Sequence, residues 1–441
     1  MKQYNLIVIG GGPGGYEAAA LAASQGKTVA LIERDKVGGT CLNRGCVPTK
    51  CLCAGAEIIC RTSAYNDFGI YGEIHTDYSV AADRATNVID ALRKDVEAYL
   101  ADVDFISADA RLAEGHTVIA GDETLNGDEI IIATGSAPRT LPVKGIEHTI
   151  TSDEFLGSRE LPDSLIIIGG GVIGLEFASV ADAYGCTVTI IEYMPEILPG
   201  FDSEIAKRLR AYLSKRGIKF VLGAQVKYIE KENGLLSVGY ETKKGETSLL
   251  ASCVLCATGR RAVLPEGLDT AGVAVSPKGF IETDACYLTT APGIYAIGDV
   301  NGRCMLAHAA SAQARVVTGI TNGFGVIPSI VFTVPECASV GLNVNSAEGL
   351  CAAKIPYSAN AKALASGEET GMLKLVYRQD DGVIVGCQAL GIHAGDLIAE
   401  ATLAIDAGYT VERLANATVS AHPSISELLA GAAAKACADR K

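Results

Sequence analysis

Two cysteines, Cys41 and Cys46, lie five residues apart in the segment GGTCLNRGCVPTK, among three glycines and one proline. On an ideal α-helix such residues have Cα atoms about 8–9 Å apart, whereas a disulfide needs about 4.4–6.8 Å. The glycines permit a distorted helix entry, and Pro48 is tolerated only in a first turn or at a kink. We therefore expect the two sulfurs to meet at a helix start, where backbone N–H groups lower the pKa of a thiol. Two buried, unreactive thiols are the alternative.

Thiol exchange also needs a group that moves protons, and the segment AHPSISE offers His422 and Glu427. Pro423 keeps His422 out of helical geometry. A structural role is equally compatible with the spacing, because Ser424 and Glu427 match a capping box at a helix start. From the spacing, a catalytic role and a capping role both stay open.

The other cysteines do not suggest a metal site. Cys51 and Cys53 extend the cluster, but zinc would need CxxC pairs or nearby histidines, and none of the six histidines is close in sequence. Most of the 14 cysteines stand singly in apolar segments, as small core residues do. We expect no metal and a cytoplasmic protein whose thiols stay reduced.

The chain begins with a pattern typical of dinucleotide binding. A strand from Tyr4 to Ile9 leads into Gly10, Gly12 and Gly15, spaced GxGxxG, and then into a helix and a second strand ending at Glu33. The glycines allow a tight turn, approach to a pyrophosphate, and close packing of helix on strand. The helix N-terminus favours the phosphate charge, and Glu33 can accept ribose hydroxyls. A purely structural glycine turn is the alternative.

The same pattern recurs in LIIIGGGVIGLEFASVADAYGCTVTIIE, with Gly169, Gly171 and Gly174 and an acid at Glu192. Glu33 follows Gly15 at the interval at which Glu192 follows Gly174, so the unit is duplicated. A carboxylate here binds a 2′-hydroxyl and repels a 2′-phosphate, and no arginine follows at once. The second unit is therefore predicted to bind NAD rather than NADP.

Three further segments read as strands ending in small residues where backbone could approach a ligand: 130–139, 254–263 and 293–300. The last ends at Asp299, whose carboxylate could bind a polyol, although each segment could be an ordinary turn. After residue 325, GMLKLVYRQDDGVIVGCQAL alternates like a hairpin that turns at Asp381–Gly382, and AGDLIAEATLAIDAG is helical in pattern. This predicts a third, α+β domain.

Size and charge limit the function. A chain of 441 residues predicts two to four domains. The formal net charge of −14 argues against nucleic acid or an anionic membrane as a partner. No apolar run is long enough to span a membrane, and a strand that starts at Tyr4 leaves no room for a leader peptide.

Two dinucleotide units with a cysteine pair after the first are a specific combination. Over essentially its whole length, the sequence resembles the pyridine nucleotide–disulfide oxidoreductases; MLAHAA, FTVPE and AHPSISE complete the matching segments. The resemblance implies an α/β fold with two Rossmann-like, glutathione reductase-like domains and a C-terminal α+β dimerisation domain. The implied boundaries are 1–145 for FAD, 146–265 for NAD, 266–325 for the rest of the FAD domain, and 326–441 for dimerisation.

The resemblance also implies the site roles. Cys41 and Cys46 form the redox disulfide, Cys41 facing substrate and Cys46 facing the flavin, while Lys50 lies beside the flavin and pairs with Glu176. His422 becomes the acid/base and Glu427 orients it, both from the partner subunit of a homodimer. The FAD residues would be Gly10, Gly12, Pro13, Gly14, Gly15, Glu33, Gly39, Thr40, Lys50, Ala110, Thr134, Gly135, Asp299 and Ala307. The NAD residues would be Gly169, Gly171, Val172, Ile173, Gly174, Glu192, Val226 and Gly259.

The implied reaction is oxidation of protein-bound dihydrolipoamide with NAD⁺, and the implied partner is a lipoylated acyltransferase or H-protein. The alternatives are a glutathione- or mercuric-reductase-like enzyme and a redox-inert flavoprotein subunit. Glu192 disfavours NADP, and only Cys437 lies near the C-terminus, where mercuric reductases carry a cysteine pair. A soluble transhydrogenase would lack the Cys41–Cys46 pair. Arg44 between the cysteines, and the residues after MLAH and ATGRR, depart from the family pattern.

Overall fold

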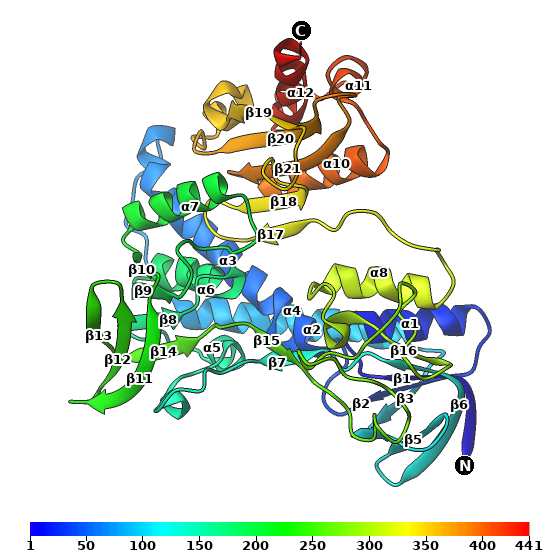
Figure 1. The fold of residues 1–441 in the computed structure, drawn as a ribbon. Coiled ribbons are helices and arrows are strands. Elements are labelled where there is room, and N and C mark those ends of the chain that lie inside the picture. Colours follow the sequence, from blue (N-terminus) through cyan, green and yellow to red (C-terminus); the bar gives the residue numbers. More distant parts are fainter. Residues whose placement is uncertain (441) are drawn as a thin grey trace.

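The computed structural model describes residues 1–440. Two sheets lie side by side in the lower half of Figure 1, and the C-terminal domain lies above them. Within the described residues, none of the helices is both long enough and apolar enough to cross a membrane.

The first sheet has seven strands in the order β3-β2-β1-β6-β5-β4, with β16 also paired to β6. β1, β2, β3, β6 and β16 pair in parallel, while β4, β5 and β6 form an antiparallel meander. β16 therefore returns the chain to the first sheet from more than 160 residues away. The strands are β1 (Lys2–Ile9), β2 (Val29–Glu33), β3 (Asp104–Ser107), β4 (Ala110–Leu112), β5 (Thr117–Ala120), β6 (Glu123–Ile132) and β16 (Ile294–Ala296).

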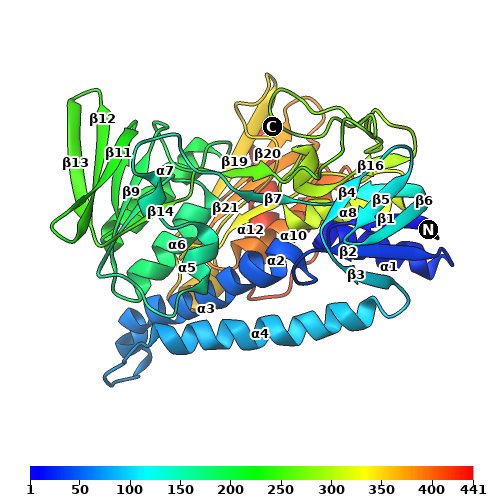
Figure 2. The same cartoon turned by 90° about the horizontal axis from the view of Figure 1, so that it is seen from below.

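Helices of the first 100 residues lie against this sheet and reach beyond it. α1 packs on α8, and α3 packs on both α4 and the second nucleotide unit. Figure 2 shows α4 running beneath α3 and on beneath the first sheet. The elements are α1 (Pro13–Ser24), α2 (Gly39–Arg44), α3 (Cys46–Arg61), η1 (Thr62–Phe68), α4 (Tyr78–Tyr99), η3 (Gly298–Asn301) and α8 (Ala307–Val317).

The second sheet is parallel throughout, in the order β10-β9-β8-β14. Its central strand is buried on both faces from Leu165 to Ile168, which explains its uninterrupted apolar sequence. An antiparallel sheet, β11-β12-β13, and a short β7-β15 ladder accompany it. The bounds are α5 (Ser152–Gly157), α6 (Val172–Ala183), α7 (Ser203–Arg216), β8 (Ser164–Ile168), β9 (Thr187–Glu192), β10 (Lys219–Leu222), β14 (Cys253–Cys256), β11 (Gln225–Glu232), β12 (Leu235–Thr242), β13 (Gly245–Ala251), β7 (Ser136–Pro138), β15 (Arg260–Ala262) and η2 (Ile146–His148).

The C-terminal domain is an antiparallel sheet, β17-β18-β21-β20-β19, with helices on it. The predicted hairpin turns at Asp381–Gly382, and the predicted helix is α10. The elements are β17 (Ser329–Val331), β18 (Cys337–Gly341), β19 (Leu350–Pro356), β20 (Met372–Arg378), β21 (Ile384–Leu390), η4 (Tyr357–Ala359), α9 (Ala361–Ala365), α10 (Ala394–Asp406), α11 (Val411–Ala417) and α12 (Glu427–Asp439).

One expectation for this hairpin is wrong: β20 does not alternate between buried and exposed residues, because Met372 to Tyr377 are all buried. The reason is that both faces of the strand are covered. Met372 joins a core shared with the second nucleotide unit, whereas Leu373 and Leu375 join the core beneath α10 and α12. The C-terminal sheet is thus packed directly on the second nucleotide unit.

A buried ion pair fixes the same contact. The Nζ atom of Lys374, on β20, lies 2.7 Å from Oδ2 of Asp202, and both side chains are about 5% exposed or less. Asp202 also caps α7, accepting hydrogen bonds from the N–H groups of Glu204 and Ile205. The ammonium and the helix N-terminus therefore share one carboxylate, which anchors the C-terminal domain to α7.

Candidate redox and nucleotide-binding site

The two cysteines belong to different helices. Cys41 lies in α2, Cys46 is the first residue of α3, and Gly45 between them breaks the helix with φ −146° and ψ −114°. A Cβ atom on Gly45 would lie 2.8 Å from the carbonyl oxygen of Thr40, so only glycine fits without a shift. Pro48 lies in the first turn of α3, where its missing N–H costs nothing. The predicted break and helix start are confirmed.

Both cysteines are thiols here, and they interact. The thiol of Cys41 donates a hydrogen bond to the sulfur of Cys46; this hydrogen bond, helped by the nearby Lys50 ammonium, outweighs burial and lowers the pKa of Cys46 to about 7. The same hydrogen bond, together with burial, raises the pKa of Cys41. Cys46 is therefore the thiolate of the reduced pair.

The start of α2, the helix that carries Cys41, packs against the first glycine turn. The N–H of Gly38 donates to the carbonyl of Gly11 at 2.8 Å. A Cβ on Gly39, whose φ is +57°, would lie 2.6 Å from the Cα of Gly12. The cysteine pair and the predicted phosphate turn thus form one unit, with Thr40 next in the same helix.

Arg44 has a structural explanation. Its Nη1 atom lies 2.6 Å from Oδ2 of Asp35, and its Nε atom lies 3.6 Å from Oδ2 of Asp153 in α5. Asp35 follows β2, so Arg44 ties α2 to the first nucleotide unit and to α5. The departure from the family pattern therefore concerns how α2 is held.

The predicted pairing of Lys50 with Glu176 is confirmed. The Nζ atom lies 3.1 and 3.0 Å from the two carboxylate oxygens of Glu176, which is only 3% exposed. Burial acts to lower the pKa of Lys50, but the attraction of Glu176 outweighs it and the pKa is raised. The backbone N–H of Phe332 also donates to Glu176, at 3.0 Å.

The first glycine turn fits a dinucleotide. A Cβ on Gly15 would fall 1.8 Å from the carbonyl oxygen of Gly10, so this position serves packing, whereas a Cβ on Gly12 would meet no atom within 4 Å. The open space at Gly12 lies at the N-terminus of α1, with Pro13, Gly14 and Gly15 in its first turn. Glu33 accepts the N–H of Gly11 at 2.7 Å. A pyrophosphate would meet unpaired N–H groups there, with the acid beside the ribose position.

The second turn repeats this geometry. A Cβ on Gly174 would lie 2.2 Å from the carbonyl oxygen of Gly169, and one on Gly171 would meet nothing within 4 Å. Glu192 accepts the N–H groups of Gly170 and Met194. Val172 and Ile173 begin α6. The residues present fit a second dinucleotide.

Asp299 is in the 3-10 turn η3, three residues beyond the end of β16, rather than at the strand end itself. Its carboxylate accepts a hydrogen bond from Ser136, whose oxygen in turn accepts one from Arg260 at 2.7 Å. Sequence reasoning did not identify Ser136 and Arg260 as supports, because they join Asp299 only through the β7-β15 ladder. The Asp299 carboxylate is thus oriented by residues of the β7-β15 ladder.

The remaining residues predicted to bind FAD or NAD lie in several elements of the two nucleotide units. Ala307 begins α8, and Nε2 of the neighbouring His308 lies 2.8 Å from the carbonyl oxygen of Pro328. The carbonyl of Val263 accepts from the hydroxyl of Thr134 at 2.6 Å. The structure places the others as follows: Ala110 half-buried at the start of β4, Gly135 before β7, Val226 buried on β11, and Gly259 between β14 and β15.

His422 and Glu427 are paired but lie apart from the cysteines of their own chain. Nδ1 of His422 lies 2.9 Å from Oε1 of Glu427, and His422 is 74% exposed. The backbone N–H of Ser424 and the hydrogen bond with His422 lower the pKa of Glu427. α12, which begins at Glu427, lies in the domain at the top of Figure 1, whereas α2 lies near the centre of the molecule.

The capping-box alternative is wrong. α12 begins at Glu427 with Ser426 as its N-cap, and the hydroxyl of Ser424 is buried without a partner. Only half of the motif is present, since Glu427 accepts the N–H of Ser424 at 2.9 Å. The Glu427 carboxylate therefore accepts hydrogen bonds from both the backbone N–H of Ser424 and the imidazole of His422.

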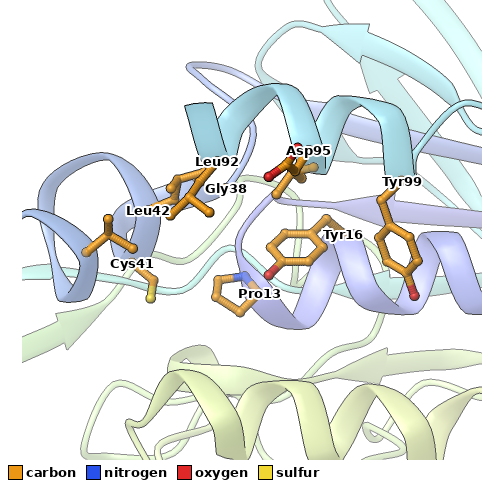
Figure 3. A pocket seen from close by; sticks show the side chains of 10 residues that line it. Pro13, Tyr16, Gly38, Cys41, Leu42, Leu92, Asp95 and Tyr99 are labelled. Carbon is orange, nitrogen blue, oxygen red and sulfur yellow. The ribbon is translucent and has the colours of Figure 1, made fainter. Parts of the chain in front are cut away.

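A cavity of about 320 Å³ opens at Cys41. Figure 3 shows its wall, with the sulfur of Cys41 beside the ring of Pro13 and with Tyr16 and Tyr99 farther along. Asp95 is the one charged side chain among its lining residues, which are Pro13, Tyr16, Gly38, Cys41, Leu42, Val47, Leu92, Asp95, Val96 and Tyr99. The α4 residues of this wall were not foreseen, because their apolar spacing is also that of an ordinary packed helix. Within residues 1–440 no cluster of three or more His, Cys, Asp or Glu could hold a metal.

Comparison with known families decides the class. The family model described as pyridine nucleotide-disulphide oxidoreductase matches residues 4–314, and the model of its dimerisation domain matches residues 327–433. The chain belongs to the pyridine nucleotide-disulphide oxidoreductases. Membership confirms the predicted fold class, an oxidoreductase activity, and FAD and NAD as cofactors. The dimerisation domain supports the expected homodimer.

Relatives in this family match the chain almost end to end. The dihydrolipoyl dehydrogenase of Geobacillus stearothermophilus is 38% identical over 97% of this chain and 95% of its own. That of Thermus scotoductus is 38% identical over 98% and 97%. Among solved structures, the Cu(II) complex of the HOCl-induced flavoprotein disulfide reductase RclA from Escherichia coli aligns with a TM-score of 0.88 at 29% identity, covering 98% of this chain and 99% of RclA.

Proposed function

We propose that this chain is an NAD-dependent dihydrolipoyl dehydrogenase, which oxidises protein-bound dihydrolipoamide to lipoamide. The relatives with that name cover nearly the whole chain, and the reactive set of that chemistry is present. The helix that carries Cys41 packs on the first glycine turn, and the Lys50–Glu176 ion pair lies near the two thiols. When bound, FAD and NAD⁺ would supply hydride transfer.

The observation that carries the substrate proposal is the cavity at Cys41. Its wall is mainly aliphatic and aromatic, with Asp95 as the single charged side chain among the lining residues. A lipoyl arm is a neutral aliphatic chain, so it loses little on leaving water for such a wall. Glutathione disulfide carries several carboxylates and would meet Asp95 there with no cation in the lining set. The cavity thus favours a dithiol on an uncharged arm.

The chain's own residues would act in a fixed order. In the oxidised enzyme, a substrate thiolate attacks the sulfur of Cys41, and the Cys41–Cys46 bond breaks so that Cys46 leaves as a thiolate. The second substrate thiol then attacks the sulfur held by Cys41, closing the lipoamide ring and releasing Cys41. The low pKa of Cys46 makes it the better leaving group. Two electrons thereby pass from the substrate to the cysteine pair.

The protons would be moved by the partner subunit's His422, supported by Glu427 of that subunit. His422 is highly exposed, and α12, which begins five residues after it, lies in the upper domain of Figure 1, away from α2. Both observations favour a site completed across the dimer. Glu427 holds the imidazole through Nδ1 at 2.9 Å and leaves Nε2 to face a substrate thiol. The lipoyl group itself would come from a separate lipoylated acyltransferase or H-protein, in the cytoplasm.

A substrate panel tests the proposal. The purified flavoprotein is assayed with lipoamide, oxidised glutathione, Hg²⁺ and Cu²⁺, each with NADH and with NADPH. We expect turnover with lipoamide and NADH at least about tenfold above any other pair, since Glu192 disfavours the 2′-phosphate. Asp95→Asn is the matched variant: it should leave lipoamide turnover unchanged and relieve part of the block on glutathione. Glutathione reduction with NADPH, without lipoamide turnover, would overturn both assignments.

A further inference from the structure

Phe332 touches both members of the Lys50–Glu176 pair. The centroid of its ring lies 4.6 Å from Nζ of Lys50, while its backbone N–H donates to Oε1 of Glu176 at 3.0 Å. One residue of the C-terminal domain therefore contacts the ammonium through its side chain and the carboxylate through its main chain. A residue that only filled space would need neither contact.

The ammonium needs such support. Lys50 has a flexible four-carbon stem, and its side chain is still about one-third exposed. Among side chains, Glu176 is the hydrogen-bond partner of Nζ that opposes its rotation toward solvent. An aromatic face attracts a partly desolvated cation through the negative charge density of the ring. The ring is thus a second partner of the ammonium besides Glu176.

The segment that carries Phe332 is itself held firmly. It is docked on α6 through two backbone N–H groups: that of Phe332 on Glu176, and that of Val334 on the hydroxyl of Ser179 at 3.3 Å. Glu176 and Ser179 are adjacent along one helix face, being three residues apart. The ring also packs on the buried cluster beneath α3 and α4, which includes Leu52 and Tyr78. Its position is therefore fixed by the junction between the C-terminal domain and α6.

We propose that Phe332 is a positioning residue that holds the Lys50 ammonium beside Cys46. The inference rests on the proposed redox function of that pair. Through Phe332, the docking of the C-terminal domain on α6 sets the electrostatic environment of the Cys46 thiolate. Neither the ring nor its main-chain N–H takes part in a bond that forms or breaks.

The test uses three variants of the full-length flavoprotein. Phe332→Leu removes the ring face but keeps an apolar side chain and the N–H to Glu176, whereas Phe332→Tyr keeps the ring. Lys50→Met supplies the background in which the ring has no ammonium to hold. The readouts are kcat and KM for dihydrolipoamide, and the pH dependence of Cys46 alkylation by iodoacetamide in a Cys41→Ser background.

We expect Phe332→Leu to lower kcat about three- to tenfold with KM within twofold, and to move the alkylation midpoint to higher pH. Phe332→Tyr should restore both, and Phe332→Leu should add nothing in Lys50→Met. A lower unfolding temperature with an unchanged pH midpoint would overturn the inference, as would equal effects of Leu and Tyr. The alkylation readout uses no lipoamide, so a midpoint shift without dihydrolipoamide turnover would refute the substrate proposal alone.

Discussion

The Cys41 thiol donates its hydrogen bond to Cys46 across the break at Gly45, and this holds the pKa of Cys46 at about 7, below its ordinary value. Because the pKa is depressed, the thiolate is the main form above about pH 7 and is lost as pH falls through that value. Cys41→Ser keeps a donor and should keep an alkylation midpoint near pH 7. Cys41→Ala removes the donor and should move the midpoint at least about one unit higher. The midpoint is read from iodoacetamide rates in each variant, and identical midpoints would contradict this account.

The two glycine turns should carry different nucleotides. A Cβ fits at Gly12 and at Gly171 without touching protein, so Gly12→Ala and Gly171→Ala should both fold normally. Each added methyl would occupy the space into which a pyrophosphate must come. Gly12→Ala should lose FAD and its yellow colour, while Gly171→Ala should stay yellow and lose NADH oxidation. Flavin absorbance after gel filtration reports bound FAD, and the rate of NADH oxidation reports NAD binding. FAD loss in Gly171→Ala and loss of NADH oxidation alone in Gly12→Ala would refute the assignment of the two turns.

The buried contact between Lys374 and Asp202 should dominate the anchoring of the C-terminal domain. Lys374→Met leaves the carboxylate buried without its cation and should cost about 3–5 kcal/mol of unfolding free energy. Lys354, which is about half exposed and pairs with Glu204 at 2.6 Å, is the matched control. Lys354→Met should cost about 1 kcal/mol or less. The unfolding free energies of both variants are measured by denaturant titration. Equal losses of unfolding free energy would contradict the role assigned to burial.

If the partner subunit's His422 completes the site, two inactive variants should rescue one another. Cys41→Ser and His422→Gln are each expected to be inactive, but a heterodimer of the two contains one intact site. Unfolding and refolding an equal mixture should return roughly one quarter of wild-type turnover, since half the dimers are mixed and each has one working site. A mixture that stays inactive would mean that each chain builds its own site.

The sequence was sufficient to predict those parts of the fold in which a residue type is required by contacts within its own short segment. Gly15 and Gly174 are required by contacts with Gly10 and Gly169 within the same turn. Their spacing therefore predicted two nucleotide units, while the glycines and Pro48 around Cys41 and Cys46 predicted the break at the cysteines. The pairing of Lys50 with Glu176 came from the family resemblance, because 126 residues separate them.

What could not be predicted depends on tertiary packing. Asp95 reaches the cavity only because α4 runs beneath α3 and the first sheet. Phe332 meets Lys50 only after the C-terminal domain has docked on α6. The expected alternation of β20 failed for the same reason, since a second domain covers the face that would otherwise be exposed. In the Ser424 motif, Glu427 makes its half of the capping box, but α12 begins at Glu427 with Ser426 as its N-cap, so the Ser424 hydroxyl caps nothing.

The most direct measurement of the central claim is the initial rate of NADH formation from dihydrolipoamide and NAD⁺ by the purified wild-type flavoprotein and by Cys41→Ser. The account predicts turnover by the wild type and a loss of at least about 1,000-fold in Cys41→Ser, with FAD still bound because the turn at Gly12 is unchanged. Near-normal turnover by Cys41→Ser, or no dihydrolipoamide turnover by the FAD-loaded wild type, would contradict it.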